Sequence, residues 1–516
     1  MKNTWIIPRN KRKLTPVVEI LSAFHLGALN EQWSGERERQ VKLETTLEEF
    51  GIKRVGHRRD QGGSGARTYE AWLACLGLIF TETVTGLQRL TIAGEMLLNG
   101  AAPKLIITDQ LMKFQYPSSY SMRQQVQVSE RFHLHPFRFM LSLLQDTDIE
   151  CLTQEEVALF VITEGDSDSD KCLKHVAERI KDFRTSGLKI LDSDFCKLYP
   201  ARTGVQSFED TLNRLNDLAN TFINFLEYTQ LAVRDADKML RIIKPLEVKH
   251  HLEKPVVFIE QPENEEYFQR KYGLAGGKTK DTRSFGLSSV SSLQIQEKLI
   301  ETFFLSTATK DLVTTKDPNL VEFISERTGC SNDLVAEKIS EYHGREVGIF
   351  ESEYFRMALA GREQSAEFEQ ATAQLFGEKG LGFKAEHTGK QRLQPDVYII
   401  SLAEGFSGII DNKAYAAYSI SNDHKNRMLH NYLPYYKGKD GHKFNFFLYI
   451  AGGFKSTFDV QVKDICYQAK ISGSGINASN VIKLLDAYKS SNLKHRDLKK
   501  LFMLEREAKW KDIAGL

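Results

Sequence analysis

Two short apolar runs, joined by a glycine-containing turn and each carrying an acidic residue at one end, constrain the fold of this chain most. The segment reads PDVYIISLAEGFSGIIDNKAY and spans residues 395–415. Asp396 precedes the first run, and Asp411 ends the second. Two β-strands connected by such a turn would bring both carboxylates to one end of a sheet. Lys413 lies two residues after Asp411, so on a strand both side chains point to the same face.

Two carboxylates and an ammonium group at one end of a sheet are typical of metal-dependent hydrolysis. Carboxylate oxygens are the ligands that Mg²⁺ prefers, and a lysine beside them can orient or help deprotonate a bound water. We therefore expect phosphodiester hydrolysis, with Asp396 and Asp411 holding Mg²⁺ near the carbonyl of Ile410 and with Lys413 acting on the water. The alternative is that both acids are ordinary turn residues at strand ends.

The neighbouring segments favour the catalytic interpretation. Residues 366–383 have apolar side chains at helical spacing, and this helix is expected to end at Gly377 or Gly380. The helix carries Glu367 and Glu369, of which Glu369 is preferred as a third catalytic carboxylate. Residues 444–454 form a nearly continuous apolar run, which predicts a central buried strand. Helix, strand, strand, helix, strand is the order of the PD-(D/E)xK nuclease core.

The segments PDVYII, GIIDNKAY and FFLYIAGGFKSTFDVQV, in this order, resemble the cleavage domain of the FokI family of type IIS restriction endonucleases. The resemblance runs from about residue 365 to residue 485. It implies that Asp396 and Asp411 bind the metal ion and that Lys413 is the catalytic lysine. It also implies in-line attack on phosphorus that leaves 5′-phosphate and 3′-hydroxyl ends.

Asp423 and Arg427 match a pair that lies, in that family, at the contact between two cleavage domains. The resemblance thus implies a transient homodimer or a second nuclease subunit. The alternative is a solvated ion pair between residues four apart on a helix. The segment between Tyr415 and Asp423 is shorter than in the family pattern, which affects the expected dimer geometry and leaves the metal site unchanged.

The net charge of +1 does not by itself indicate DNA binding, but phosphate contact requires only a local basic patch. Residues 1–68 contain thirteen Lys and Arg against eight Asp and Glu. A glycine-rich loop follows one of the basic clusters and would let the backbone approach DNA closely. The alternative is a flexible, solvated loop. The residues expected to contact DNA are Arg9, Lys11, Arg12, Lys53, Arg54, Arg58, Arg59, Asp60, Gln61 and Arg67.

The N-terminal half reads as short helices with polar connections, which is typical of helix-turn-helix or winged-helix modules and equally of an ordinary α-bundle. Thr153 and Glu156 are placed as a capping box. A basic N-terminus and helical modules before a FokI-like nuclease resemble the AlwI-type group. That resemblance implies an N-terminal region that reads a short asymmetric double-stranded DNA site, and a C-terminal domain that cuts a few bases outside it.

The expected fold is a multidomain α+β protein. We predict DNA-recognition subdomains at residues 1–150 and 151–290, a helical linker at 291–345, and at 346–516 an α/β PD-(D/E)xK cleavage domain with a central mixed sheet. A chain of 516 residues is long enough for several domains, and 41% hydrophobic and 27% charged residues are typical of a globular protein. We expect a cytoplasmic protein with six reduced cysteines and no membrane partner.

The function predicted from these features is that of a type IIS restriction endonuclease. No methyltransferase motif is apparent, so protection of host DNA would require a separate cognate DNA methyltransferase. Three alternatives remain open at this point: a strand-specific nicking endonuclease of the same family, a structure-selective DNA repair nuclease, and a DNA-binding protein with an inactive nuclease fold.

Overall fold

The chain is a mixed α+β protein that divides into two compact units. The computed structural model describes residues 2–56, 62–200, 207–235, 237–286, 291–388 and 394–516. Unit 1 comprises residues 1–306 and 324–338, and unit 2 comprises residues 307–323 and 339–516. The predicted subdivision at residues 150 and 290 and the predicted linker at 291–345 stay predictions.

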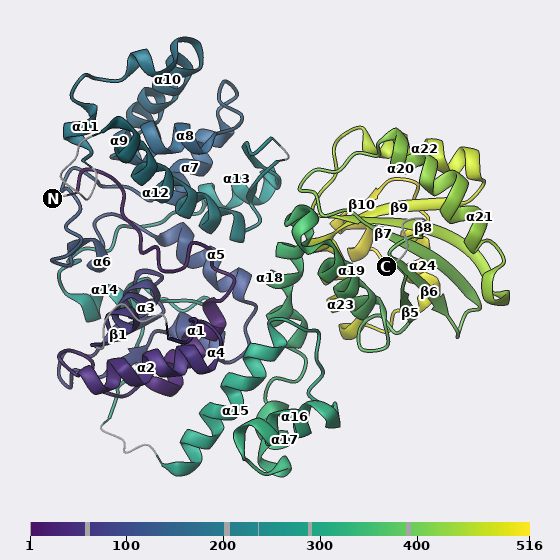
Figure 1. Ribbon diagram of the computed structural model, residues 1–516, viewed down its shortest axis with the longest axis horizontal. Coiled ribbons are helices and arrows are strands. Elements are labelled where there is room, and N and C mark those ends of the chain that lie inside the picture. Colours follow the sequence, from purple (N-terminus) through teal and green to yellow (C-terminus); the bar gives the residue numbers. More distant parts are fainter. Residues whose placement is uncertain (1, 57–61, 201–206, 236, 287–290, 389–393) are drawn as a thin grey trace. The chain divides into compact units, whose positions relative to one another are not determined.

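Unit 1 is mainly helical (Figure 1). Its helices are α1 (Val17–Gly27), α2 (Arg37–Glu49), α3 (Ser64–Cys75), α4 (Ile92–Leu98), α5 (Pro103–Lys113), α6 (Ser119–Met122), α7 (Pro136–Gln145), α8 (Gln154–Glu156), α9 (Ile162–Glu164), α10 (Asp170–Ser186), α11 (Phe195–Leu198), α12 (Phe208–Tyr228), α13 (Pro245–Glu253) and α14 (Glu265–Tyr272). Two short turns, η1 (Val157–Val161) and η2 (Gly187–Ile190), interrupt them. Two antiparallel hairpins complete the unit, one of β1 (Ile79–Thr81) with β2 (Gln88–Leu90) and one of β3 (Ala232–Arg234) with β4 (Leu240–Ile242).

The N-terminal segment of unit 1 is bound to helices that lie far along the chain. Trp5 is fully buried, and its indole nitrogen donates a hydrogen bond of 2.7 Å to the carbonyl of Gly165. Its ring packs edge-on against Phe222 of α12, with ring centroids 5.4 Å apart. The two predicted recognition subdomains therefore share a core. The predicted capping box is confirmed, since Thr153 and Glu156 each accept the backbone N–H of the other.

Helices α15 (Ser292–Ala308), α16 (Pro318–Thr328) and α17 (Asn332–Ser340) confirm the helical pattern predicted after residue 293, and they fall where the chain passes between the units. Unit 2 then contains helices α18 (Glu346–Leu359), α19 (Ser365–Phe376), α20 (Asn422–Arg427), α21 (Leu433–Tyr436), α22 (Phe458–Ala469), α23 (Ala478–Ser490), α24 (His495–Phe502) and α25 (Trp510–Ala514). Its short helical turns are η3 (Gly361–Gln364), η4 (Met428–Tyr432) and η5 (Lys439–Gly441). Its strands are β5 (Lys384–His387), β6 (Val397–Ser401), β7 (Phe406–Asn412), β8 (Lys443–Ala451), β9 (Ser472–Asn477) and β10 (Glu507–Ala508).

The strands of unit 2 form a six-stranded mixed sheet in the order β10-β9-β8-β7-β6-β5. Strands β5, β6 and β7 are antiparallel, whereas β7, β8, β9 and β10 run parallel. The predicted hairpin is confirmed by the pairing of β6 with β7, and its turn contains Gly405 with a positive φ of 64°. The apolar run at 444–454 is confirmed as central, because β8 lies between β7 and β9. Helix α19 ends before Gly377, one of its two predicted ends.

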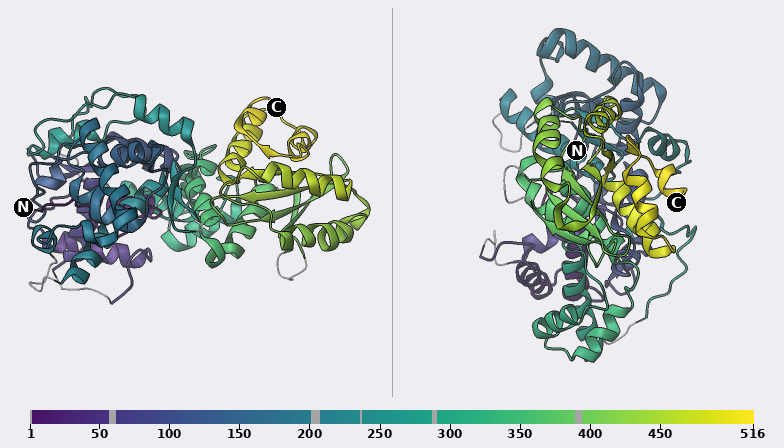
Figure 2. Two further views of the ribbon diagram at one scale, coloured as in Figure 1. Left: turned by 90° about the horizontal axis from the view of Figure 1, so that it is seen from above. Right: turned by 90° about the vertical axis from the view of Figure 1, so that its right-hand side faces the viewer.

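Helices cover both faces of this sheet (Figure 2). On one face, helices α20, α21 and α22 pack over a buried cluster that includes Tyr398, Ile409, Met428, Tyr432, Tyr449 and Phe458. The other face carries aromatic contacts to the remaining helices, such as Phe446 of β8 against Phe502 of α24, with ring centroids 5.0 Å apart. Side chains alternate between the two faces along each strand. Within the described ranges, no helix is both long and apolar enough to cross a membrane.

Candidate active site

The backbone pairing of β6 with β7 brings Asp396 close to Asp411. The amide of Asp396 donates a hydrogen bond of 3.1 Å to the carbonyl of Ile410, which continues the strand register by one residue beyond β6. Asp396 is in phase with Tyr398, and Asp411 is in phase with Ile409, so both acids lie on the face covered by α20, α21 and α22. The Ile410 carbonyl, expected near the metal ion, is engaged in this sheet hydrogen bond.

Lys413 completes the predicted group. Its Nζ atom lies 2.8 Å from Oδ1 of Asp411, and the two side chains are 14% and 3% exposed. A charged pair that is so little exposed loses most of its hydration and depends on its partners for stabilisation. The structure thus brings together the three residues that the sequence motif singled out.

The charges of this group shift the pKa of two of its members. Burial, followed by the nearby Asp411 carboxylate, raises the pKa of Asp396 well above its ordinary value. Burial alone would lower the pKa of Lys413, but the carboxylates of Asp411 and Asp396 outweigh it and raise that pKa. A carboxyl group that resists ionisation beside a firmly protonated lysine is an arrangement found at functional sites.

Asn412, between the two motif residues, anchors the site and was missed by sequence reasoning. Its backbone N–H donates a hydrogen bond of 2.5 Å to Oδ2 of Asp396. Its side-chain amide donates to the carbonyl of Phe368 at 3.1 Å and to the hydroxyl of Thr372 at 2.7 Å, both on α19. Asn412 points away from the face of Asp411 and Lys413, so it ties the catalytic strand to the helix behind it. The signal available in the sequence was an asparagine between the aspartate and the lysine of the D-x-K motif.

One of the two glutamates of helix α19 lies near the site. Glu367 is exposed, whereas Glu369 is 17% exposed and is close enough to Asp396 to contribute to its raised pKa. Nε2 of His387, on the edge strand β5, lies 3.1 Å from the Glu369 carboxylate. Sequence reasoning did not identify His387, and a single histidine at the end of a four-residue strand gives no motif by which to find it.

The carboxylates fit a divalent cation that takes only a few of its ligands from the protein. The carboxyl groups of the buried Asp411 and the half-buried Asp396 lie beside one lysine, and the pKa of Asp396 is raised by its removal from water and then by the Asp411 carboxylate. Among the residues that the structure describes, no group of three or more His, Cys, Asp or Glu side chains is arranged to hold a metal ion. Mg²⁺ commonly takes one or two carboxylates and fills its remaining positions with water and substrate phosphate, so the two aspartates suffice.

Asp423 and Arg427 lie at the surface on α20. Arg427 Nη2 is 2.5 Å from Asp423 Oδ2, and the side chains are 38% and 64% exposed. The pair therefore has the geometry of the i,i+4 ion pair that was the alternative interpretation, and each group also remains accessible to solvent. The predicted contact between two cleavage domains stays a prediction.

The N-terminal residues expected to contact DNA fall into three groups. Lys11 donates to the carbonyl of Ile52 at 2.7 Å, Lys53 pairs with the buried Glu44, and Arg67 donates to Gln40 and Gly62. Arg9 and Arg12 both face Asp217, and Arg54 is exposed. The third group, Arg58, Arg59, Asp60 and Gln61, lies outside the described residues.

Both parts of the chain match families of restriction endonucleases. Residues 329–509 match the FokI cleavage domain, and residues 74–275 match the AlwI restriction endonuclease family. No curated protein matches the chain.

Solved structures give weak likenesses. The structure of restriction endonuclease FokI is 12% identical over 96% of this chain and 98% of that chain, with a TM-score of 0.28. FokI bound to DNA has the same TM-score at 13% identity, covering 97% of this chain and 98% of that chain. The BpuJ1 endonuclease binding domain, in complex with modified DNA, has a TM-score of 0.36 at 12% identity, covering 52% of this chain and 96% of that chain.

These TM-scores lie below 0.5, so the family assignment rests on the two sequence matches. The FokI match contains Asp396, Asp411 and Lys413, and it ends one residue after β10, the last strand of the mixed sheet. The AlwI match lies wholly within unit 1. Together, the two matches support a FokI-like type IIS restriction endonuclease.

Proposed function

We propose that the chain binds a short asymmetric site in double-stranded DNA through its N-terminal region and hydrolyses phosphodiester bonds a few bases outside that site. The cleavage domain acts with Mg²⁺ as its cofactor. The observation that carries this proposal is the buried Lys413–Asp411 ion pair beside Asp396, a carboxyl group whose pKa is raised. A purely structural ion pair has no need for a second, destabilising carboxylate.

Asp396 and Asp411 hold the cation, and Glu369 assists through the cation or a water. When bound, Mg²⁺ supplies positive charge that offsets the two aspartates and the scissile phosphate. Asn412 holds the Asp396 carboxylate in position through its backbone N–H. Because Asn412 is also bonded to α19, the aspartate is fixed before the substrate binds.

Lys413 acts as a hydrogen-bond donor in this mechanism. Its pKa is raised, so at neutral pH the side chain carries its proton and cannot take one from the attacking water. Instead, its ammonium group orients the water and stabilises negative charge on the phosphate. The water oxygen attacks phosphorus and releases a proton to solvent, the bond to the 3′-oxygen breaks, and that oxygen takes up a proton from solvent. The products are 5′-phosphate and 3′-hydroxyl ends.

Two further parts of the proposal concern recognition and assembly. In unit 1, three helices, α1, α2 and α3, are followed by the β1–β2 hairpin, and this order of elements supports a winged-helix-like module. Asp423 and Arg427 remain partly exposed, which supports a role in pairing two cleavage domains on DNA. In this proposal, residues 1–150 and 151–290 recognise DNA, and the linker at 291–345 joins them to the cleavage domain. A separate methyltransferase would protect host DNA.

The test is cleavage of plasmid DNA with Mg²⁺, followed by sequencing of the ends. We expect wild-type protein to cut at a fixed offset from one short sequence. Asp411→Asn and Lys413→Ala should each lower the cleavage rate at least about a hundredfold while leaving DNA affinity intact. Glu369→Gln should lower it about tenfold, and Glu367→Gln, a matched change on the exposed side of the same helix, should not.

Each alternative function gives a different result. A nicking endonuclease would leave plasmid cut in one strand, and a structure-selective nuclease would produce ends with no common sequence. A protein with an inactive nuclease fold would bind DNA and leave it uncut. Undiminished cleavage by Asp411→Asn or Lys413→Ala would rule out the proposed active site.

A further inference from the structure

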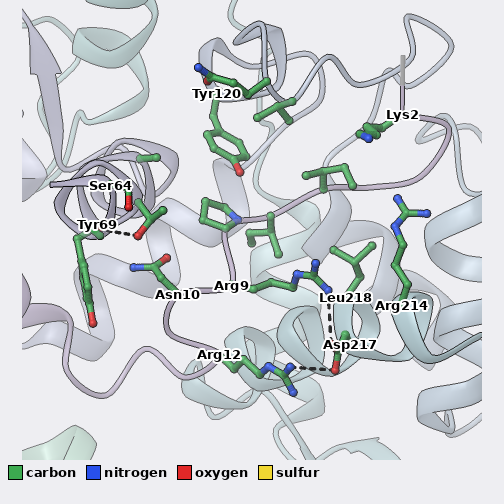
Figure 3. Close-up of a pocket in the computed structure, with 18 of the residues that line it drawn as sticks. Lys2, Arg9, Asn10, Arg12, Ser64, Tyr69, Tyr120, Arg214, Asp217 and Leu218 are labelled. Atoms are coloured by element: carbon green, nitrogen blue, oxygen red, sulfur yellow. Dashed lines mark hydrogen bonds and ion pairs between the residues drawn. The ribbon is translucent and has the colours of Figure 1, made fainter. Parts of the chain in front are cut away.

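A cavity of about 740 Å³ in unit 1 is lined mainly by polar and basic residues (Figure 3). Its walls come from segments that are distant in the sequence: the N-terminal residues 2–12, Lys53, the first turns of α3, residues 120–126, and one face of α12. A volume of this size exceeds that of a few waters and lies within the usual range of ligand sites.

The charges in this cavity are unbalanced. Arg9 and Arg12 approach the same carboxylate, that of Asp217, at 3.7 Å and 3.0 Å (Figure 3). Lys2 and Arg214 also line the cavity, whereas Asp217 is its sole acidic residue among the described lining residues. In its described lining the cavity thus holds more basic than acidic side chains, and two of the basic ones face Asp217, so it favours a further anionic group.

Asn10 provides an independent sign that a polar ligand enters. Both its side-chain amide nitrogen and its amide oxygen are buried, and within the described part of the chain neither has a hydrogen-bond partner. Asn10 lines the cavity between Arg9 and the start of α3 (Figure 3). Buried polar groups are nearly always hydrogen-bonded in folded proteins, and an exception calls for an unfilled partner position. An amide that can both donate and accept matches the edge of a nucleotide base.

We infer that this cavity binds the DNA backbone, and that Asp217 occupies the position of a DNA phosphate until DNA displaces it. A carboxylate and a phosphodiester each present two oxygens and one negative charge, and the planar guanidinium group can donate two hydrogen bonds to either. Arg9 and Arg12 would exchange Asp217 for a backbone phosphate, while Asn10 bonds a polar edge of the adjoining nucleotide. This inference rests on the proposed recognition of DNA by the N-terminal region.

The exchange is feasible because the Asp217 ion pairs are open to solvent. The side chains of Asp217 and Arg12 are 44% and 50% exposed, and that of Arg9 is 21% exposed. Ion pairs at such exposure contribute little stability and are readily replaced. Asp217 would therefore weaken the binding of every DNA sequence slightly and equally, so that retention on DNA would depend on the base contacts made elsewhere.

The experiment measures the affinity of full-length protein for two fluorescein-labelled duplexes over a series of NaCl concentrations. One duplex carries the site identified from sequenced digests, and the other has the same composition in scrambled order. All proteins carry Lys413→Ala to prevent cutting. The variants are Arg9→Gln, Arg12→Ala and Asp217→Asn. Asp194→Asn is the matched control, since it removes one carboxylate from an exposed pair with Lys197, elsewhere in unit 1.

We expect Asp217→Asn to tighten binding of both duplexes about two- to five-fold at low salt, as expected for the loss of a half-exposed competitor. Arg9→Gln and Arg12→Ala should weaken binding and make its salt dependence shallower by about one ion each. Asp194→Asn should change neither quantity. Unchanged or weaker binding by Asp217→Asn would overturn the inference, as would unchanged binding by both arginine variants with normal thermal unfolding.

Competition by inorganic phosphate separates DNA from a free anion as the ligand. At matched ionic strength we expect it to displace the duplex no better than chloride does, and selective displacement would overturn the inference in favour of a small-anion site. The proposed function fails separately, if wild-type protein neither binds nor cuts any DNA. If wild type cuts at a defined site while Asp217→Asn binds normally, only the inference about Asp217 fails.

Discussion

Asp396 is the residue at which the chemistry of the site opposes the stability of unit 2. Its pKa is raised well above the ordinary value because it is partly removed from water and because Asp411 lies beside it. The folded protein therefore holds a proton on this carboxyl over a pH range in which the unfolded chain has released it. Without a cation, stability from this group is present below about pH 4 and is lost as the pH rises through the folded-state pKa.

We predict that Asp396→Asn abolishes cleavage and yet stabilises the protein in EDTA at neutral pH. The amide keeps an acceptor for the Asn412 N–H and removes one of two repelling charges. The free energy of unfolding at pH 7 should rise by about 1 kcal/mol or more, and the gain should vanish near pH 4. Urea unfolding at the two pH values measures this. Mg²⁺ should stabilise wild type at pH 7 and have little effect on the variant; lower stability of the variant in EDTA would contradict this account.

At the scale of the elements, the position of the carboxylates depends on how closely β7 packs against β8. Gly408 of β7 pairs with Phe446 of β8, at a point where the register shifts by one residue. A Cβ atom at Gly408 would lie 2.4 Å from Cζ of Phe446, which is closer than such atoms approach in folded proteins. Glycine is thus required here for close packing, three residues before Asp411.

We predict that Gly408→Ala lowers the free energy of unfolding of unit 2 by about 1–3 kcal/mol through overpacking. Phe446→Leu should relieve the clash, so the double variant should lose less stability than the sum of the two single variants. Gly438→Ala is the matched control: this glycine has a φ of 92° and open space around its Cβ position. Gly438→Ala should lower the free energy of unfolding because alanine is strained at this backbone conformation, and Phe446→Leu should not reduce that loss. Urea unfolding of wild type, the three single variants and the two double variants measures these changes. Strict additivity of Gly408→Ala and Phe446→Leu would argue against the clash.

At the scale of the whole molecule, one group of Asp396, Asp411 and Lys413 in its proposed role would cut one strand at a time. A double-strand break needs two such groups or two successive visits. Asp423 and Arg427 lie on α20, on the face of the sheet that carries the catalytic residues, and both remain partly exposed. This placement supports their proposed role in pairing cleavage domains close to the scissile bonds.

We predict that Asp423→Ala and Arg427→Ala slow double-strand cleavage about tenfold, an effect expected from losing an interfacial charge pair worth about 1.4 kcal/mol. Nicked plasmid should accumulate, and DNA affinity should stay constant because the residues proposed to bind DNA lie in unit 1. With wild type, the double-strand rate should continue to rise with protein concentration after all sites are bound. Lys500→Ala, on an exposed i,i+3 pair of α24, serves as control. Saturation of the rate at site occupancy would exclude pairing.

The sequence predicted the elements around the active site because their signals are local. Alternating and continuous apolar runs predicted β6, β7 and β8, and the spacing of Asp411 and Lys413 placed both on one strand face. Glycine predicted the end of α19. The contact between Glu369 and His387 joins a helix to an edge strand, and no local spacing indicates it. The same holds for Asn412, whose partners are on α19.

By itself, then, the sequence determined the strand hairpin, the side of the sheet on which its catalytic residues lie, and the FokI-like resemblance that accompanies them. The sequence already preferred Glu369 over Glu367, but only the tertiary structure showed that Glu369 lies near Asp396, and which basic residues are already bonded to protein atoms. It also brought Arg9 and Arg12 to Asp217 of α12, which lies far from them in the sequence. The physical reason is that periodicity records which face of an element is buried, whereas pairing between distant charges depends on how the elements pack.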